Sequence, residues 1–116
     1  MPINKRQLGT NKEDYACKYL EEKGYIIKER NFRYKHGEID IIAFKDDELI
    51  FIEVKYRSSD RYGMPYEAVD YRKKQRIINA SRFYMAINNI YDSQIRYDVI
   101  SILNDEISHY ENAFNS

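Results

Sequence analysis

Two acidic residues and a lysine in the first half of the chain have the types and spacing of a hydrolytic site. Asp40 is followed, after a gap of 12 residues, by Glu53, and Lys55 comes two positions later. If the segments that carry them pair as a hairpin, Asp40 lies directly opposite Glu53 and both side chains leave the same face. Opposed like charges destabilise a sheet, so such a pair favours a bound cation. Mg²⁺ takes one or two carboxylates with water and phosphate oxygens, and Lys55 could then hold a water nucleophile or a phosphate.

The same three residues also allow a structural interpretation, and the sequence pattern leaves the two open. Lys55 could neutralise both carboxylates, and the cluster would then be a network of salt bridges. The pairing of the two acids depends on the turn between the strands. A two-residue turn at Asp46-Asp47, or a four-residue loop, pairs positions whose numbers sum to 93. A three-residue loop would shift the register by one residue and undo that pairing.

The elements around this hairpin are predicted from capping residues and from hydrophobic spacing. Thr10 and Glu13 have the form of a capping box at the start of a first helix, and Gly24 supplies its stop. The predicted elements are a helix at residues 11–23, strands at 25–34, 38–44 and 49–56, a helix at 66–89, and strands at 96–103 and 107–110. This order predicts a single α/β domain, residues 1–116, with a mixed sheet and a helical crossover.

Apolar side chains predict which faces of these elements are buried. The second helix has a stripe at helical spacing, formed by Val69, Ile77, Ala80, Tyr84, Ile87 and Tyr91. One face of the hairpin is expected to be wholly apolar, with Ile39, Ile41 and Ala43 against Ile50, Ile52 and Val54. Lys73 lies on the helix stripe, where a lysine is costly unless its head reaches a carboxylate or a phosphate. We therefore expect Lys73 to reach the acidic site.

Composition and charge exclude several classes of protein. With 116 residues, 43% hydrophobic and 33% charged, the chain has the make-up of a soluble globular domain without a membrane helix. Its one cysteine, Cys17, excludes an internal disulfide and a multi-cysteine zinc site. No secretory signal is recognised, so the expected location is cytoplasmic. The net charge of zero divides into +4, −5, +5 and −4 over residues 1–37, 38–71, 72–91 and 92–116.

Asp40 with Glu53-Val54-Lys55 resembles the PD-(D/E)xK signature of nucleases, with Ile39 where the signature has proline. The match is sharpened by Gly37-Glu38-Ile39-Asp40-Ile41-Ile42-Ala43, by Glu67-Ala68-Val69 with Lys73, and by Tyr97-Asp98-Val99. Over nearly its whole length the chain resembles the YraN-like uncharacterised protein family, which is related to archaeal Holliday-junction resolvases. The resemblance implies a restriction-endonuclease-like fold, a mixed β-sheet flanked by helices in the order α-β-β-β-α-β-β. It also implies a metal-dependent endonuclease that hydrolyses phosphodiester bonds in DNA, branched or junction DNA included.

The resemblance assigns a role to each matching residue. Asp40 and Glu53, with the Val54 carbonyl, would hold Mg²⁺ or Mn²⁺, and Lys55 would position or deprotonate the attacking water. Glu13 would assist at the metal, although a capping box explains a glutamate there as well. DNA is the expected partner, with RNA left open, and a homodimer would supply the two sites that junction cleavage requires. The alternative hypothesis is a non-catalytic module of the same fold that binds nucleic acid or a protein partner.

Further candidates surround these residues. Contacts with the nucleic-acid backbone are expected from Lys73, Arg57, Ser58 and His36. A polar loop and a surface histidine are the alternative interpretations of the last three. Glu38 either supports the metal ligands or pairs with Lys55. Lys74 and Arg76 are expected to point elsewhere, either as phosphate contacts or, as we favour, on a solvated face. Asp98 is interpreted as structural.

Overall fold

The computed structural model describes residues 5–57 and 70–115, with only the backbone given for residues 5–11. Its elements are α1 (Lys5–Glu22), β1 (Ile26–Tyr34), β2 (Gly37–Lys45), β3 (Glu48–Arg57), α2 (Tyr71–Ile87), β4 (Gln94–Leu103) and β5 (Glu106–Phe114). This is the predicted order α-β-β-β-α-β-β, and the fold is α/β with a mixed five-stranded sheet. Within the described residues, no helix is long and apolar enough to cross a membrane.

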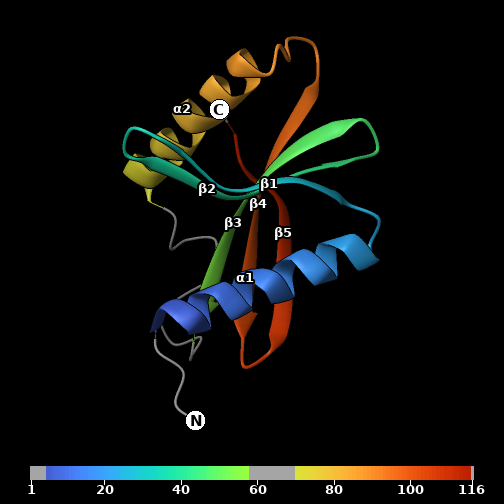
Figure 1. Cartoon of the computed structure of the whole chain (residues 1–116), viewed down its shortest axis with the longest axis vertical. Coiled ribbons are helices and arrows are strands. Elements are labelled where there is room, and N and C mark those ends of the chain that lie inside the picture. The colour runs from blue at the N-terminus through green and yellow to red at the C-terminus, as the bar shows by residue number, and fades with distance from the viewer. Residues whose placement is uncertain (1–4, 58–69, 116) are drawn as a thin grey trace.

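The five strands lie side by side in chain order, β1-β2-β3-β4-β5. Neighbours are antiparallel except for β3 and β4, which are parallel. A parallel pair needs a crossover connection, and α2 lies in the connection between these two strands. Figure 1 shows α1 and α2 on opposite sides of the sheet, so that each helix covers one face.

Each helix packs on its own hydrophobic cluster. On one face, Ile77 and Tyr84 of α2 pack with Ile42 and Phe51 of the hairpin. On the other face, α1 packs against the sheet through the side chains of Ala16, Cys17, Leu20, Ile41, Ala43, Ile50 and Ile52. Apolar burial on both faces therefore determines where the two helices lie.

The turn of the hairpin has two residues, as one of the predicted alternatives requires. Asp46 and Asp47 have φ values of 51° and 64°, and positive φ at both positions characterises a type I′ turn. The register runs from Lys45↔Glu48 to Ile41↔Ile52, so paired positions sum to the predicted 93. The ladder ends there, one step before Asp40 and Glu53.

The alternation of side chains along β2 is interrupted at Asp40. Ile41 and Ala43 face α1 as predicted. The prediction for Ile39 is wrong, because Ile39 packs in the α2 cluster together with Ile42. Strict alternation would place Ile39 with Ile41, so the strand changes its local geometry between these two residues. The interruption coincides with the end of the β2–β3 ladder.

The first helix begins earlier than predicted. It starts at Lys5, so Thr10 lies inside the helix and the predicted capping box is wrong. Glu13 is freed from a capping role because its backbone is already helical on both sides, and its carboxylate accepts hydrogen bonds from β1 instead. The predicted stop is confirmed. Gly24 has φ 90°, and the Tyr25 N–H donates to the Leu20 carbonyl across it.

The second helix is shorter than predicted. It begins at Tyr71, where the Asp70 carboxylate caps the Lys73 N–H at 2.8 Å; residues 66–69 of the predicted helix lie outside the described residues. The predicted burial is wrong for Ile87 and Tyr91, which are 55% and 76% exposed. Tyr91 follows the end of the helix, so helical spacing no longer applies to it. Ile78 and Ser81 share the buried face, which turns this face away from Ile87.

Candidate active site

Asp40 and Glu53 lie next to each other at the point where β2 and β3 stop pairing. The Asp40 Oδ2 accepts a hydrogen bond of 2.8 Å from the Val54 N–H. A side chain of β2 therefore binds the β3 backbone one residue beyond Glu53. This contact holds the Asp40 carboxyl group beside that of Glu53, although the two residues are not partners in the ladder.

Two lysines converge on one oxygen atom of Glu53. The Nζ of Lys73 lies 2.6 Å from Glu53 Oε1, and the Nζ of Lys55 lies 3.3 Å from the same atom. The Glu53 side chain is 6% exposed, so the charge of its carboxylate is compensated by the two lysines and not by hydration. Lys55 comes from the same strand, whereas Lys73 comes from the first turn of α2. Packing of α2 on the sheet therefore completes the cluster.

The proton affinities of these groups reflect their burial and mutual charge. Burial raises the pKa of Asp40 to about 8, and the Glu53 charge adds to the effect. Burial and the neighbouring Lys73 hold the pKa of Lys55 below its ordinary value. Burial also works against the charge on Lys73, but its hydrogen bonds to Glu53 and Lys55 outweigh burial and raise its pKa. The site thus combines a carboxyl group that resists ionisation with a lysine that releases its proton more readily than usual.

These carboxyl groups open into a cavity of about 550 Å³ between the sheet and the start of α2. The side chains that line it are charged or polar with few exceptions. They belong to His36, Glu38, Asp40, Glu53, Asp70, Arg72, Lys73, Arg76 and Ile77. Three of the acidic groups come from the strands, Asp70 caps the start of α2, and the basic groups come mainly from the helix. The cavity can therefore receive a ligand that carries negative charge and also brings or shares a cation.

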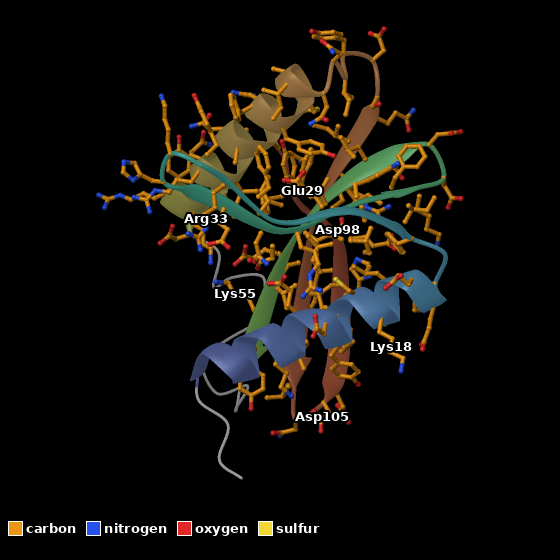
Figure 2. The ribbon with its side chains drawn as sticks, viewed as in Figure 1. Lys18, Glu29, Arg33, Lys55, Asp98 and Asp105 are labelled. Carbon is orange, nitrogen blue, oxygen red and sulfur yellow. The ribbon has the colours of Figure 1, made fainter. Side chains whose placement is uncertain are left out.

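Other residues expected at the site are placed less centrally. Glu13 accepts hydrogen bonds from Arg30 Nε at 3.0 Å and Asn31 Nδ2 at 2.9 Å, yet its charge still helps to raise the pKa of Asp40. Glu38 lines the cavity, and its carboxylate lies 3.7 Å from Arg33 rather than against Lys55. Figure 2 shows Lys55 and Arg33 on different parts of the sheet.

The two candidates that follow β3 lie at the limit of the described chain. Arg57 is the last residue of β3. Ser58 lies outside the described residues. Among the described residues that line the acidic cavity, Arg57 does not appear. Their expected contacts with nucleic acid stay predictions.

Two residues of α2 and its N-cap residue line the cavity but were missing from the sequence-based set. Asp70 and Arg72 stand at the helix start, and Arg76 lies one turn beyond Lys73. The prediction that Arg76 points away from the site is wrong. Residues three apart on a helix share a face, so the spacing from Lys73 to Arg76 was the signal that could have identified it. Lys74 does point elsewhere, and its Nζ lies over the Phe114 ring.

The donor atoms at the site suit a hard divalent cation better than zinc. Among the described residues, no group of three or more His, Cys, Asp and Glu side chains gathers in a way that could hold a metal. Asp40 and Glu53 supply two carboxylates, and Mg²⁺ needs no more than one or two when water and phosphate fill the remaining positions. The raised pKa of Asp40 shows that its negative charge lacks full compensation. A divalent cation bound by Asp40 and Glu53 would supply the missing positive charge.

Asp98 belongs to a separate buried network. It is 0% exposed and binds Arg96 Nε at 2.8 Å, His109 Nε2 at 2.7 Å and the Asn112 N–H at 2.9 Å. Despite burial, these hydrogen bonds keep the pKa of Asp98 below its ordinary value. The Tyr19 hydroxyl of α1 lies 3.0 Å from the other ring nitrogen of His109. The network ties β4, β5 and α1 together, which supports a structural role, and Figure 2 shows Asp98 near the centre of the fold.

Comparisons with known proteins identify relatives of similar length. Residues 12–102 match the family model described as Uncharacterised protein family UPF0102. A UPF0102 protein of Persephonella marina is 44% identical, covering 92% of both chains. One from Clostridium perfringens is 47% identical over 94% of this chain and 90% of its own. The crystal structure of SSO0001 aligns with a TM-score of 0.48 at 22% identity, over 92% of this chain and 51% of the other. That similarity is too low to support an argument about function.

Proposed function

This chain belongs to the uncharacterised protein family UPF0102, and we propose from its site geometry that it is a divalent-metal-dependent DNA endonuclease. The observation that carries the proposal is the half-buried Asp40 beside the buried Glu53, whose carboxylate is paired with both Lys55 and Lys73. Two carboxylates beside a lysine of lowered pKa supply what metal-assisted hydrolysis of a phosphodiester requires. The order of elements also agrees with the restriction-endonuclease-like fold that the resemblance implies.

Each residue has a role that its surroundings favour. Asp40 and Glu53, with the Val54 carbonyl, would hold Mg²⁺ or Mn²⁺, which would offset negative charge on the phosphate. Lys55 is suited to orient the attacking water and accept its proton, because its pKa lies below the ordinary lysine value. Lys73 keeps its proton and its position through Glu53. It can therefore bind a phosphate oxygen without leaving the cluster.

The basic residues of α2 explain how a polyanion would enter a cavity that contains acids. Arg72 and Arg76 of α2 line the same cavity as the carboxyl groups of the strands. A guanidinium group can donate two parallel hydrogen bonds to one phosphate group. The two arginines can therefore align a nucleic-acid backbone with the scissile phosphate toward Asp40. Residues 72–91 contain five Lys and Arg and no acid, whereas the chain as a whole is neutral. The positive charge is thus concentrated where the substrate would bind.

One observation favours the alternative of a non-catalytic binding module. Lys73 already lies 2.6 Å from Glu53 and provides part of the charge compensation that a metal would provide. If this ion pair persists when divalent cations are present, the cluster is a salt-bridge network. Binding of nucleic acid through the arginines would then be the whole function.

The decisive experiment is cleavage of labelled linear, nicked, flapped and four-way-junction DNA with Mg²⁺ or Mn²⁺. We expect cleavage by the wild type and a loss of at least about a hundredfold in Asp40→Asn and Lys55→Ala, the scale of removing a catalytic group. Asp105→Asn is the matched control, because Asp105 has a side chain that is 81% exposed and pairs only with Lys12 among the described residues. It should cleave like the wild type.

Two results would reject the nuclease. The first is cleavage that survives unchanged in Asp40→Asn and Lys55→Ala, which would indicate a contaminating enzyme. The second is the absence of cleavage of DNA and RNA together with the absence of divalent-metal binding by calorimetry. The second result would leave the non-catalytic module as the alternative.

A further inference from the structure

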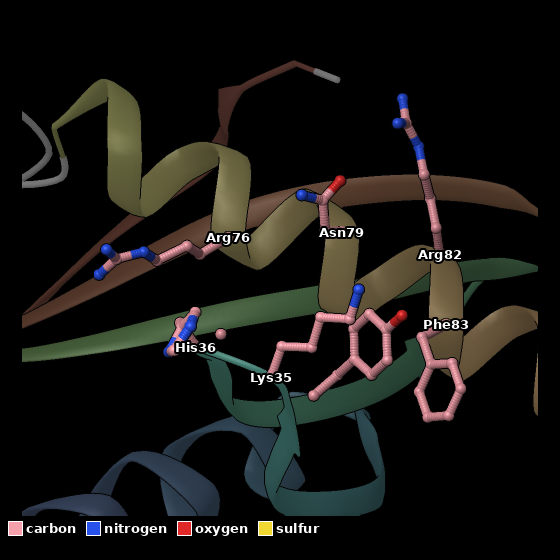
Figure 3. Close-up of a pocket in the computed structure, with 8 residues that line it drawn as sticks. Lys35, His36, Arg76, Asn79, Arg82 and Phe83 are labelled. Atoms are coloured by element: carbon pink, nitrogen blue, oxygen red, sulfur yellow. The ribbon is translucent and has the colours of Figure 1, made fainter.

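A second cavity adjoins the acidic one, between the β1–β2 turn and α2. It has a volume of about 530 Å³ and is lined by Tyr34, Lys35, His36, Gly37, Arg76, Asn79, Arg82 and Phe83. His36, Gly37 and Arg76 line both cavities. Figure 3 shows the turn residues Lys35 and His36 facing Arg76, Asn79 and Phe83 along the helix. The two cavities therefore meet where the β1–β2 turn touches α2.

The contact between turn and helix is close because Gly37 has no side chain. A Cβ atom at this position would lie 2.4 Å from the Arg76 carbonyl oxygen and 3.0 Å from its carbon. The main chain of the turn thus packs directly on the main chain of α2. The contact brings Arg76, which lines both cavities, close to the turn that carries Lys35, which lines the second cavity.

The second cavity differs from the first in its chemistry. Its lining includes the basic residues Lys35, Arg76 and Arg82, together with two aromatic rings and no acid. The rings of Tyr34 and Phe83 are stacked, with centroids 4.1 Å apart and planes 13° apart. Phe83 is 36% exposed, although it is an apolar residue. An exposed flat ring beside cationic groups matches a nucleotide, whose base stacks and whose phosphate is negative.

We propose that this second cavity binds an unpaired nucleotide of the DNA substrate next to the scissile phosphate. The base packs against Phe83, and the adjoining phosphate is held by Arg76 and Lys35. The nucleotide must be unpaired, because a base inside a duplex has both faces covered by its neighbours and cannot stack on a protein ring. This inference rests on the proposed nuclease function and narrows its substrates to DNA with a single-stranded part.

The chemistry of the shared residues supports one path for the strand. Arg76 lines both cavities, so a phosphate bound to it joins the nucleotide in the second cavity to the phosphate beside Asp40. The acids lie only in the first cavity, where they can share a cation with the substrate. The second cavity offers positive charge alone, which suits binding and not chemistry. The strand would thus be bound in the second cavity and cleaved in the first.

The test measures binding without metal, so that it does not depend on cleavage. Fluorescence anisotropy in EDTA compares labelled oligothymidine, an abasic strand of equal length and a blunt duplex. We expect oligothymidine to bind about tenfold more tightly than the abasic strand, within the roughly 5- to 150-fold range that stacking of one base provides. Equal binding of the abasic and the oligothymidine strands by the wild type would overturn the proposal without any variant.

Variants then locate the effect. Phe83→Leu keeps an apolar side chain without the ring and should lose about tenfold in oligothymidine affinity while binding the abasic strand as before. Tyr91→Leu is the matched control, because Tyr91 is 76% exposed and lies outside the cavity; its affinity should not change. If thermal denaturation shows Phe83→Leu to be unfolded, Lys35→Gln is tested in its place. It should reduce the slope of log affinity against log salt concentration by about one, the value for one lost phosphate contact. An unchanged slope would overturn the proposal.

Cleavage assays separate the failure of this inference from the failure of the proposed function. If the wild type cleaves flapped DNA and Phe83→Leu binds and cleaves it equally well, the nucleotide site is rejected and the nuclease stands. If binding depends on Phe83 but no metal supports cleavage, the nucleotide site stands and the nuclease is rejected. Preferential binding and cleavage of blunt duplex by the wild type would also reject the nucleotide site.

Discussion

Replacing Asp40 with asparagine should stabilise the metal-free protein at neutral pH while abolishing its activity. Asp40 is held beside Glu53 by the Val54 N–H, and its pKa in the folded protein is about 8. In the unfolded chain an aspartate has a pKa of roughly 4. Asparagine in its place can still accept the Val54 hydrogen bond but carries no charge. Asp40→Asn therefore removes the free-energy cost of keeping the Asp40 carboxyl group protonated when the protein folds at neutral pH.

The magnitude follows from the difference between the two pKa values. Between about pH 4 and pH 8 the folded protein keeps the Asp40 proton and the unfolded chain has lost it. Unfolding then releases a proton, so the free energy of unfolding falls by up to roughly 1.4 kcal/mol per pH unit as pH rises. A lone group would lose about 4 kcal/mol over three pH units. Glu53 and the two lysines titrate with Asp40, and we expect a loss of about 2–4 kcal/mol.

Urea denaturation of both proteins in EDTA, at several values between about pH 5 and pH 8, measures this effect. The wild type should lose stability relative to Asp40→Asn across that range, and Asp105→Asn should follow the wild type. Addition of Mg²⁺ should remove the slope of the wild type, because a cation favours the ionised pair, and should leave Asp40→Asn unaffected. A difference between wild type and Asp40→Asn that stays constant with pH would refute the reasoning about the paired acids.

Three further predictions follow from contacts described above. Gly37→Ala should lower the free energy of unfolding by about 1–3 kcal/mol, because its Cβ would overlap the backbone of Arg76. Asp98→Asn should cost about 2–4 kcal/mol at neutral pH, because Arg96 loses its closest carboxylate while keeping Glu48 and the more distant Glu111, and the cost should shrink below about pH 4, since the Asp98 contribution exists only when it is ionised. Lys73→Met should cost about 1–3 kcal/mol, less than the loss of a sole partner, because Glu53 retains a second lysine.

Urea denaturation tests all three, each with a different discriminating result. His36→Ala on the same turn is the control for Gly37→Ala, and equal stability of the two variants would show that the turn tolerates a side chain. For Asp98→Asn, a cost that does not depend on pH would contradict the assignment of its lowered pKa. For Lys73→Met, a rise in stability would mean that the lysine is held at Glu53 against its own desolvation.

The sequence was sufficient for the parts of the fold that local rules control. The two-residue turn at Asp46-Asp47 and the alternation of apolar residues together determine the register of β2 and β3. The apolar stripe of α2 was enough to bring Lys73 toward the sheet, because helical spacing places it on the buried side. These features depend on residues close in the chain.

Two of the errors involve contacts between distant residues. Ile39 changes its face because Asp40 binds the backbone of β3 instead of continuing the ladder. Arg76 reaches the cavity because Gly37 lets α2 approach the turn, and this sets the rotation of the helix about its axis. Thr10 has a good capping side chain, but capping preferences do not stop a helix that can continue toward Lys5.

Both outer strands of the sheet are interrupted, and this affects how copies of the chain can meet. The pairing of β1 with β2 shifts between Ile27 and Glu29, and that of β5 with β4 shifts opposite Asp98. The second bulge is held from inside the protein, because the Asn112 N–H donates to the buried Asp98 carboxylate. A bulged edge presents no regular row of N–H and C=O groups for another sheet to extend. The same buried aspartate that ties the core together therefore protects the chain from edge-to-edge aggregation, and a homodimer is expected to form through another surface.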